Sequence, residues 1–213
     1  TRSGRVTGVQ TCALPISSDE MVTLMQSGEY DVVSASGDAS LRLIYGGDVA
    51  PVNTDLIPNY ADVFDNLKLQ PWNSIDGVPY GVPHGRGANL LAYRTDIVKP
   101  APTSWGAVFD ANSPYKGKIT AYDSPIYIAD AALYLMKTQP DLGITYPYAL
   151  DQKQFDASIE LLKAQKPLIG EYWGDYLKHV ASLKSGATAL GTTWQVNINL
   201  AQGEGTKIGR AHV

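Results

Sequence analysis

The chain has 213 residues, of which 44% are hydrophobic and 18% are charged, and its formal net charge is -4. This composition is typical of a folded globular protein and excludes collagen-like and disordered chains. No apolar stretch approaches the roughly 20 residues that a membrane-spanning helix needs. A net acidic chain also lacks the basic face that nucleic acid favours, so we expect no nucleic-acid partner.

The two ends of the chain are related at the level of DNA. When residues 11–16 are back-translated, the reverse complement, shifted by one base, encodes residues 208–213. One oligonucleotide that resembles a sequencing-library adapter therefore accounts for both ends. We predict that residues 1–16 and 208–213 are artefacts, and segments of this kind are set aside before fold reasoning. The one cysteine, Cys12, lies in the first of them, so no disulfide framework or cysteine zinc site is expected.

Residues 17–88 alternate between helical and extended patterns. Helices are predicted from apolar residues at helical spacing, the strand from a short apolar run, and the hairpin from an Asp-Gly turn signal. The predicted elements are a helix through Met21, Leu24 and Met25 that ends at Gly28, a strand over 30–33, a helix that follows Ser36 and ends at 46–47, a loop region over 48–72, and a hairpin over 72–82 with its turn at Asp76-Gly77.

Residues 89–207 continue the alternation with longer helices. Asp151 and Gln154 form a capping-box pattern, and Pro125 is suited to the first turn of a helix. The predicted elements are strands over 89–93, 118–122 and 187–192, and helices that begin near Ser104, Ser124, Asp151 and Asp175. Short strands that alternate with helices predict an α/β fold with a mostly parallel sheet covered on both faces.

In open α/β sheets, ligands bind beyond the carboxyl ends of strands. That rule selects the residues that directly follow predicted strands. They are Ser36, Gly37, Asp38, Tyr122, Asp123, Ser124, Thr193 and Trp194.

Five sequence stretches occur in the order found in one protein family. They are residues 28–33, 76–83, 91–96, 102–105 and 115–118. Together they resemble extracellular solute-binding proteins of bacterial ABC importers, most of all the spermidine/putrescine-binding branch, over about residues 20–205. The resemblance implies a two-lobed, periplasmic-binding-protein-like fold of type II that closes on its ligand. We expect a chain truncated at both ends, with a partial first lobe over 17–88 and most of a second lobe over 89–207.

The resemblance also implies residues of the ligand cleft. Ser36, Asp123 and Trp194 match family cleft positions. Other positions depart from the pattern of polyamine binders. Asp38 stands in place of a tyrosine, Ile126 in place of a glutamate, and His84 and Arg86 in place of aromatic residues.

A polyamine pocket needs carboxylates for its ammonium groups and aromatic faces along its methylenes. Asp38, Asp123, Tyr122 and Trp194 supply both kinds of group. A simpler interpretation is open for each of them. The two carboxylates precede helices and are placed to cap backbone amides, and a lone tryptophan is more often part of a core.

His84 and Arg86 favour the opposite ligand chemistry. Cations that face a cleft repel a polyamine and favour a carboxylate or phosphate, for which arginine offers a two-pronged donor. The alternative is that both lie on a solvated hinge surface. A further cluster, which contains Trp173, could line the cleft or form a loop packed on the following helix. Its members are Glu171, Tyr172, Trp173, Asp175 and Tyr176.

Enzyme motifs are absent from residues 17–207. His84 and His179 are the two histidines, and no nucleophile-elbow, zinc-protease or P-loop pattern occurs. We therefore expect a monomeric binding protein without cofactor or metal, located in the periplasm or at the cell surface, whose partners are a small solute and a membrane permease. The signal sequence is expected to lie outside this fragment. The alternatives are a binder of an anionic or zwitterionic metabolite and a cytosolic ligand-sensing domain of related fold.

Overall fold

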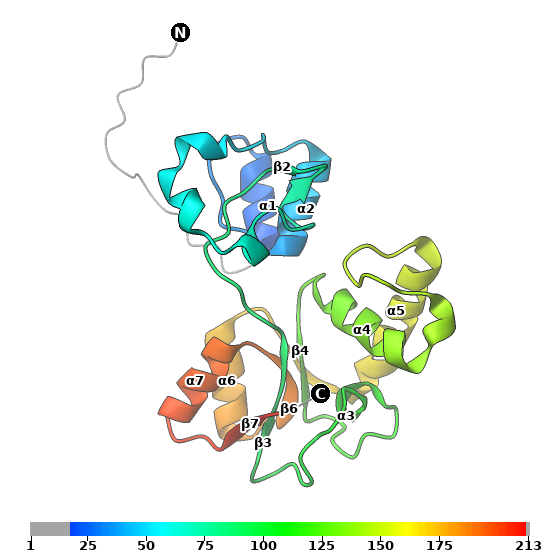
Figure 1. Cartoon of the computed structure of the whole chain (residues 1–213). Helices are drawn as coiled ribbons and strands as arrows, with labels where there is room; N and C mark the ends of the chain where they lie inside the picture. Colours follow the sequence, from blue (N-terminus) through cyan, green and yellow to red (C-terminus); the bar gives the residue numbers. More distant parts are fainter. Residues whose placement is uncertain (1–17, 212–213) are drawn as a thin grey trace.

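A computed structural model describes residues 18–211, which form two lobes (Figure 1). The first lobe holds helices α1 (Ser18–Gln26) and α2 (Gly37–Gly46) and a hairpin of β1 (Ser74–Ile75) and β2 (Val78–Pro79). Between them lie three short 3-10 helices, Thr54–Leu56, Pro58–Asp62 and Asp65–Leu67. Within the described residues the chain passes once to the second lobe, through residues 80–89, which we call the connecting segment.

Local signals explain where α2 ends and where the hairpin turns. Gly47 adopts a left-handed backbone with φ 74° and donates its N–H to the Ile44 carbonyl, which ends α2 as predicted. Asp76 and Gly77 both have positive φ, 50° and 78°, as a tight hairpin turn requires. The predicted hairpin is therefore confirmed, with shorter strands. Val22, Ala39 and Leu43 form the small core between α1 and α2.

The strand predicted over 30–33 is wrong. No strand forms there, and Val32 is 84% exposed. A strand is stable only beside a hydrogen-bonded neighbour. Among residues 18–211, no backbone segment is hydrogen-bonded to this stretch in a ladder.

The second lobe contains a five-stranded sheet. Its order is β5 (Ile169–Trp173), β4 (Ile119–Tyr122), β6 (Leu190–Thr193), β3 (Leu90–Arg94) and β7 (Ile208–Arg210). β4 runs parallel to β5 and β6, but β3 runs antiparallel to β6 and β7. Four strands therefore run in one direction, as predicted, but β3 runs against them, so the sheet is mixed. The reason is that β3 enters from the first lobe at the edge of the sheet where β6 ends, so Leu90 lies opposite Thr193.

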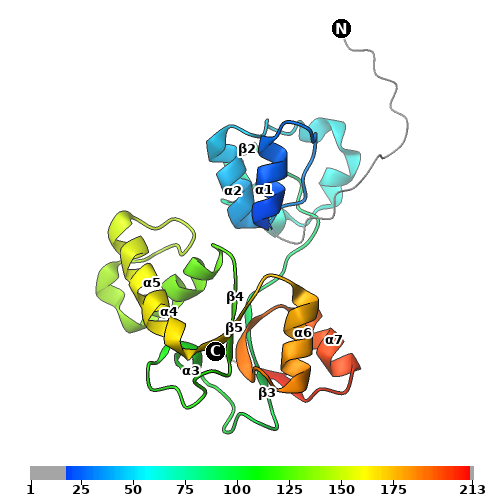
Figure 2. The same cartoon turned by 180° about the vertical axis from the view of Figure 1, so that it is seen from behind.

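Helices lie on both sides of this sheet, as predicted. α4 (Tyr127–Thr138) and α5 (Gln152–Gln165) lie to one side, and α6 (Tyr176–Ser185) and α7 (Gln195–Gly203) to the other (Figure 2). The remaining helical segments are α3 (Gly106–Phe109) and the 3-10 helices Pro140–Leu142 and Lys166–Leu168. None of the helices in the described range is long and apolar enough to cross a membrane.

The capping box of α5 is confirmed. The Asp151 carboxylate accepts from the Gln154 backbone N–H at 2.8 Å, and the Gln154 side chain accepts from the Asp151 N–H at 3.1 Å. Neither β5 nor α7 was predicted. β5 occupies the Glu171–Trp173 stretch that was assigned to a cluster or loop, and α7 follows Trp194 directly.

β7 consists of residues that the DNA relation assigns to an adapter. It pairs with β3, and the Ala211 N–H donates to the Leu91 carbonyl at 2.8 Å. The origin of residues 208–213 stays a prediction. Residues 1–16, the other predicted artefact, lie outside the described residues.

Candidate functional site

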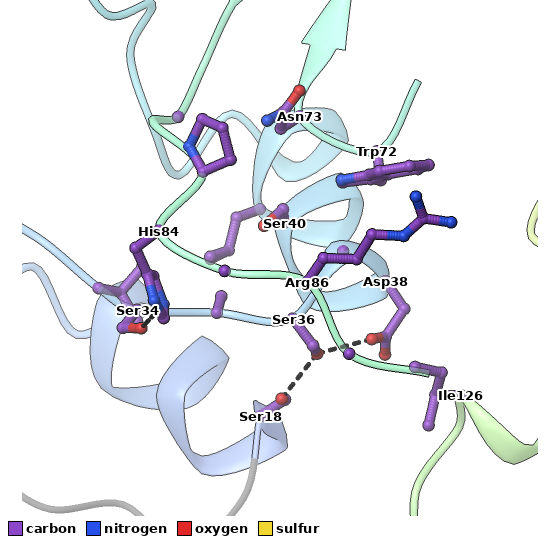
Figure 3. A pocket seen from close by; sticks show the side chains of 18 of the residues that line it. Ser18, Ser34, Ser36, Asp38, Ser40, Trp72, Asn73, His84, Arg86 and Ile126 are labelled. Atoms are coloured by element: carbon purple, nitrogen blue, oxygen red, sulfur yellow. Dashed lines mark hydrogen bonds between the residues drawn. The ribbon is translucent and has the colours of Figure 1, made fainter. Parts of the chain in front are cut away.

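A cavity of about 640 Å³ lies between the lobes. The first lobe contributes residues around the start of α2, together with Trp72 and Asn73, and the connecting segment contributes one side (Figure 3). The second lobe contributes Tyr122, Ile126, Tyr148 and Trp194. Seven predicted site residues meet here. They are Ser36, Gly37, Asp38, His84, Arg86, Tyr122 and Trp194.

The topology explains why these residues meet. Tyr122 ends β4, and Trp194 directly follows β6, so both stand at the carboxyl edge of the sheet. Asn89 lies at the same edge because β3 is antiparallel to β6. The strand-end rule therefore finds the second-lobe wall, although the sheet is mixed.

A chain of hydroxyl groups leads to the carboxylate on the first-lobe wall. Ser36 Oγ donates to Asp38 Oδ1 at 2.7 Å and lies 2.7 Å from Ser18 Oγ (Figure 3). Ser36 is the N-cap of α2 but makes no side-chain bond to the helix backbone. Asp38 Oδ2 is buried and has no hydrogen-bond partner among the described residues. An unpaired buried carboxylate oxygen is costly, so this atom is suited to a donor or cation that arrives with a ligand.

An aromatic cluster forms the second-lobe wall. Tyr122 lies edge-on to Trp194 with ring centroids 4.9 Å apart, and Trp173 contacts both rings at 4.6 and 4.9 Å. Burial raises the pKa of Tyr122, so its phenol stays neutral at ordinary pH. Cation–π attraction to such faces is worth roughly 0.5–2 kcal/mol.

Trp173 lies beneath this wall. Only 2% of it is exposed, and it does not line the cavity. Its Nε1 donates to the Thr192 carbonyl at 3.1 Å, and its ring stacks on His179 at 4.5 Å. It supports the Tyr122 and Trp194 rings that line the cavity and has no surface of its own for a ligand.

Sequence reasoning missed Asn89, which orients the indole of the wall. Trp194 Nε1 donates to Asn89 Oδ1 at 3.0 Å, and Asn89 also lines the cavity. The sequence signal that could have indicated Asn89 was its place at the end of the glycine-containing connecting segment, directly before a strand.

His84 and Arg86 are exposed on the connecting segment, and both line the cavity. His84 Nε2 lies 2.9 Å from Ser34 Oγ, which ties the segment to the first lobe. No carboxylate in the described part of the chain forms an ion pair with Arg86. The cavity therefore contains both the Asp38 carboxylate and a guanidinium that forms no ion pair within residues 18–211.

Asp123 and its neighbours on β5 lie elsewhere. Asp123 is exposed and follows β4, its backbone N–H donates to the Trp173 carbonyl at 2.9 Å, and it does not line the cavity. The Asp175 side chain caps α6 by accepting from the Leu177 N–H at 2.8 Å. Glu171, Tyr172 and Tyr176 are also absent from the cavity lining.

A second, more open cavity of about 480 Å³ adjoins the first. The two share Asp38, Ile126 and Tyr148. Its remaining lining is largely apolar and includes Tyr45 of α2 and Phe155 of α5. No group of three histidine, cysteine or acidic side chains within residues 18–211 is arranged to hold a metal ion.

Solved structures share this architecture. A putative spermidine/putrescine ABC transporter protein from Listeria monocytogenes matches with TM-score 0.70 and 14% identity over 92% of this chain and 57% of its own. A spermidine/putrescine substrate-binding protein from Streptococcus pneumoniae matches with TM-score 0.62 and 16% identity, over 92% of this chain and 57% of its own. A PBP from A. tumefaciens B6 in complex with glucopine matches with TM-score 0.61 and 18% identity, over 90% of this chain and 56% of its own.

These likenesses establish the fold, and the chain spans little more than half the length of these structures. The sequence itself matches a family, described as bacterial extracellular solute-binding protein, over residues 6–212. With the two-lobed α/β fold and a cavity between its lobes, the chain belongs to the bacterial extracellular solute-binding protein family.

Proposed function

We propose that this chain is the solute-binding component of an ABC importer and that it captures a small organic amine, such as putrescine or spermidine, between its lobes. The carrying observation is the unpartnered Asp38 Oδ2 in a cavity whose other wall is aromatic. An ammonium group satisfies that oxygen, and the faces of Tyr122 and Trp194 accommodate the methylenes and a second charge.

The size of the cavity supports a small ligand. Small-molecule sites usually enclose about 300–1,000 Å³, and this one encloses about 640 Å³. The adjoining cavity shares Asp38 and Tyr148 with the first and offers space for a longer amine. Asp123 enters this proposal only if closure of the lobes brings it toward the ligand.

The location and partner follow from the same proposal. The family description as extracellular supports a place outside the cytoplasm, in the periplasm or at the cell surface. The partner is then the membrane permease that receives the solute, and the chain acts as a monomeric carrier without catalytic activity. A permease gene and an ATPase gene beside this reading frame are expected. An adjacent DNA-binding segment in the same frame would indicate a ligand sensor instead.

A second candidate is a zwitterionic amine. His84 and Arg86 line the same cavity as Asp38, so one end offers a carboxylate and the connecting segment offers cations. Such a pair suits a ligand with an ammonium group at one end and a carboxylate at the other. The glucopine-bound neighbour is an instance of this fold with a ligand other than a polyamine.

Thermal-shift titration of the protein expressed from the complete reading frame tests both candidates. Putrescine, spermidine, γ-aminobutyrate and succinate are compared. Stabilisation by the two polyamines supports the first candidate, and stabilisation by γ-aminobutyrate alone supports the second. Stabilisation by succinate alone contradicts both and assigns the site to His84 and Arg86.

Asp38→Asn locates the site. It should weaken the polyamine effect, because it removes the charge opposite the ammonium group. Asp62→Asn, an exposed first-lobe carboxylate that does not line the cavity, is the matched control. Asp123→Asn tests the second-lobe carboxylate in the same assay. Equal binding by the Asp38 and Asp62 variants would exclude Asp38 from the site.

A further inference from the structure

Asp130 is a buried carboxylate without a cation. It lies in the first turns of α4 and is only 4% exposed. Buried acids are rare unless they are paired, because the charge loses its hydration. None of the ion pairs formed within residues 18–211 includes Asp130. It accepts from the Asn89 amide, whose Nδ2 lies 3.2 and 3.3 Å from the two carboxylate oxygens.

The chemistry of the neighbours fixes the orientation of the Asn89 amide. A carboxylate only accepts hydrogen bonds, and an indole N–H only donates them. Asn89 Nδ2 therefore faces Asp130, and Asn89 Oδ1 faces Trp194 Nε1 at 3.0 Å. The three side chains form one directed relay from α4, through the start of β3, to the N-terminus of α7.

This relay ends at the ligand cavity. Asn89 and Trp194 both line it, and Asn89 is the last residue of the connecting segment. A second buried amide in the same lobe differs in this respect. Gln165 is fully buried, and its amide donates to the Val108 carbonyl and the Tyr127 hydroxyl, which lie away from the cavity. A polar network that served only the core would have no need to reach the half-buried indole.

We propose that Asp130 is a positioning residue for the solute cavity, acting through Asn89 to hold the Trp194 indole in its ligand-facing orientation. This inference rests on the proposed function for its biological meaning. Ionised Asp130 presents two acceptor oxygens to the Asn89 amide. Protonated Asp130 loses part of that capacity, which loosens Asn89 and the indole that it orients.

The charge state of Asp130 changes in an accessible pH range. Burial raises the pKa of Asp130 to about 7, and the side chains of Asn89 and Thr192 limit that rise. The titratable groups that interact with its charge are Tyr127 on the same helix and Tyr148 ahead of α5. Burial raises the pKa of both phenols, so both stay neutral from about pH 5 to pH 9. The relay is therefore expected to respond to Asp130 alone.

Nuclear magnetic resonance of the ¹⁵N-labelled indoles tests the relay without any solute. The Trp194 Nε1–H resonance, assigned with Trp194→Phe, should move with a midpoint near pH 7. Asp130→Asn should hold it near its low-pH position at every pH, and Asn89→Ala should also abolish the titration. The Trp105 resonance should not follow this midpoint. Asp156→Asn is the matched control, since Asp156 is an exposed helical carboxylate that accepts from the Gln152 amide.

Two results would overturn the relay. One is a Trp194 resonance that does not titrate near pH 7, and the other is a titration that persists in Asp130→Asn. Since Asn89→Ala and the wild-type pH series do not depend on the folding of the Asp130 variant, the test stands if that variant is unstable.

Putrescine affinity tests the positioning role separately. Wild-type binding should weaken about 2- to 10-fold from pH 8 to pH 6, the range expected for one lost hydrogen bond, and Asp130→Asn should flatten this dependence. A pH dependence identical in wild type and Asp130→Asn overturns the positioning role. Failure of the wild type to bind any amine contradicts the proposed function instead, and the indole titration still decides the relay.

Discussion

The two lobes support the walls of one cavity with unequal amounts of buried structure. In the second lobe, the cavity residues follow strands of a five-stranded sheet whose core includes Leu91, Ile119 and Leu190. In the first lobe, they surround the start of α2. This helix packs on α1 through a small core of Val22, Ala39 and Leu43. A wall on a packed sheet is held by many neighbours, whereas a helix on a small core moves more easily. The aromatic wall is therefore preorganised, and the carboxylate wall is the adaptable one.

The largest expected effect comes from the sheet core. Leu190 is fully buried in β6, so Leu190→Ala should lower the free energy of unfolding by about 2–5 kcal/mol. Urea unfolding followed by circular dichroism measures this change. Leu43→Ala is the matched first-lobe variant, because Leu43 is buried to a similar degree.

Amide hydrogen exchange distinguishes the two variants. Leu43→Ala should accelerate exchange in α1 and α2 and leave β4 and β6 protected. Leu190→Ala should accelerate exchange throughout the second lobe. If Leu43→Ala loosens the sheet as much as Leu190→Ala does, the lobes unfold as one unit and the comparison between them fails.

The next effect depends on pH and belongs to the second lobe. His179 is fully buried, and burial lowers its pKa from 6.5 to about 4. Between these values the unfolded chain binds a proton at this histidine and the folded chain does not, so the contribution of His179 to stability is lost as pH falls from about 6.5 to about 4. The loss is on the order of 3 kcal/mol. Burial of Asp130, whose pKa is raised to about 7, acts in the opposite direction over the same range. The difference in unfolding free energy between wild type and His179→Gln at pH 7, pH 5.5 and pH 4 therefore isolates the histidine contribution.

His179→Gln should remove the loss of stability toward low pH that the histidine causes, because glutamine does not titrate. His84→Gln removes an exposed histidine of the connecting segment and is the control. A slope that is the same in wild type and His179→Gln would show that other groups cause the acid sensitivity.

The smallest effect compares the N-caps of the two lobes. Asp151→Ala should destabilise α5 by about 1 kcal/mol, because Asp151 accepts the Gln154 N–H. Ser36→Ala should destabilise α2 less, because Ser36 makes no side-chain cap bond and donates to Asp38 instead. The main effect of Ser36→Ala should be a weaker affinity for amines. An equal loss of stability in both variants would mean that Ser36 serves the helix rather than the cavity.

Much of the fold could be predicted because its signals are local. The capping box at Asp151, the Asp76-Gly77 turn and the glycine that ends α2 each act within a few residues. Strand pairing is not local. The missing strand at 30–33 and the antiparallel β3 depend on which segments lie alongside, and the sequence pattern of a single strand does not contain that information.

The site was predictable to the extent that it lies at strand ends. Tyr122 and Trp194 follow β4 and β6, and Asp38 lies at the start of a helix. Asp123 shows the limit of the rule, since it follows β4 but does not line the cavity. Trp173, which was predicted as part of a separate cluster, lies beneath the wall. Asn89 was missed because its importance comes from two distant partners, Asp130 and Trp194, that adjoin it only in the folded chain.

The connecting segment has a further consequence for the lifetime of the protein. Residues 84–88 are exposed and have no regular secondary structure, and side chains at Gly85 and Gly87 would meet open space. Proteases cut accessible segments of this kind in preference to packed elements. A single cleavage here would place Asp38 and Trp194 on separate pieces and leave the sheet whole. This lack of packing therefore makes the segment the point at which the site is most easily destroyed.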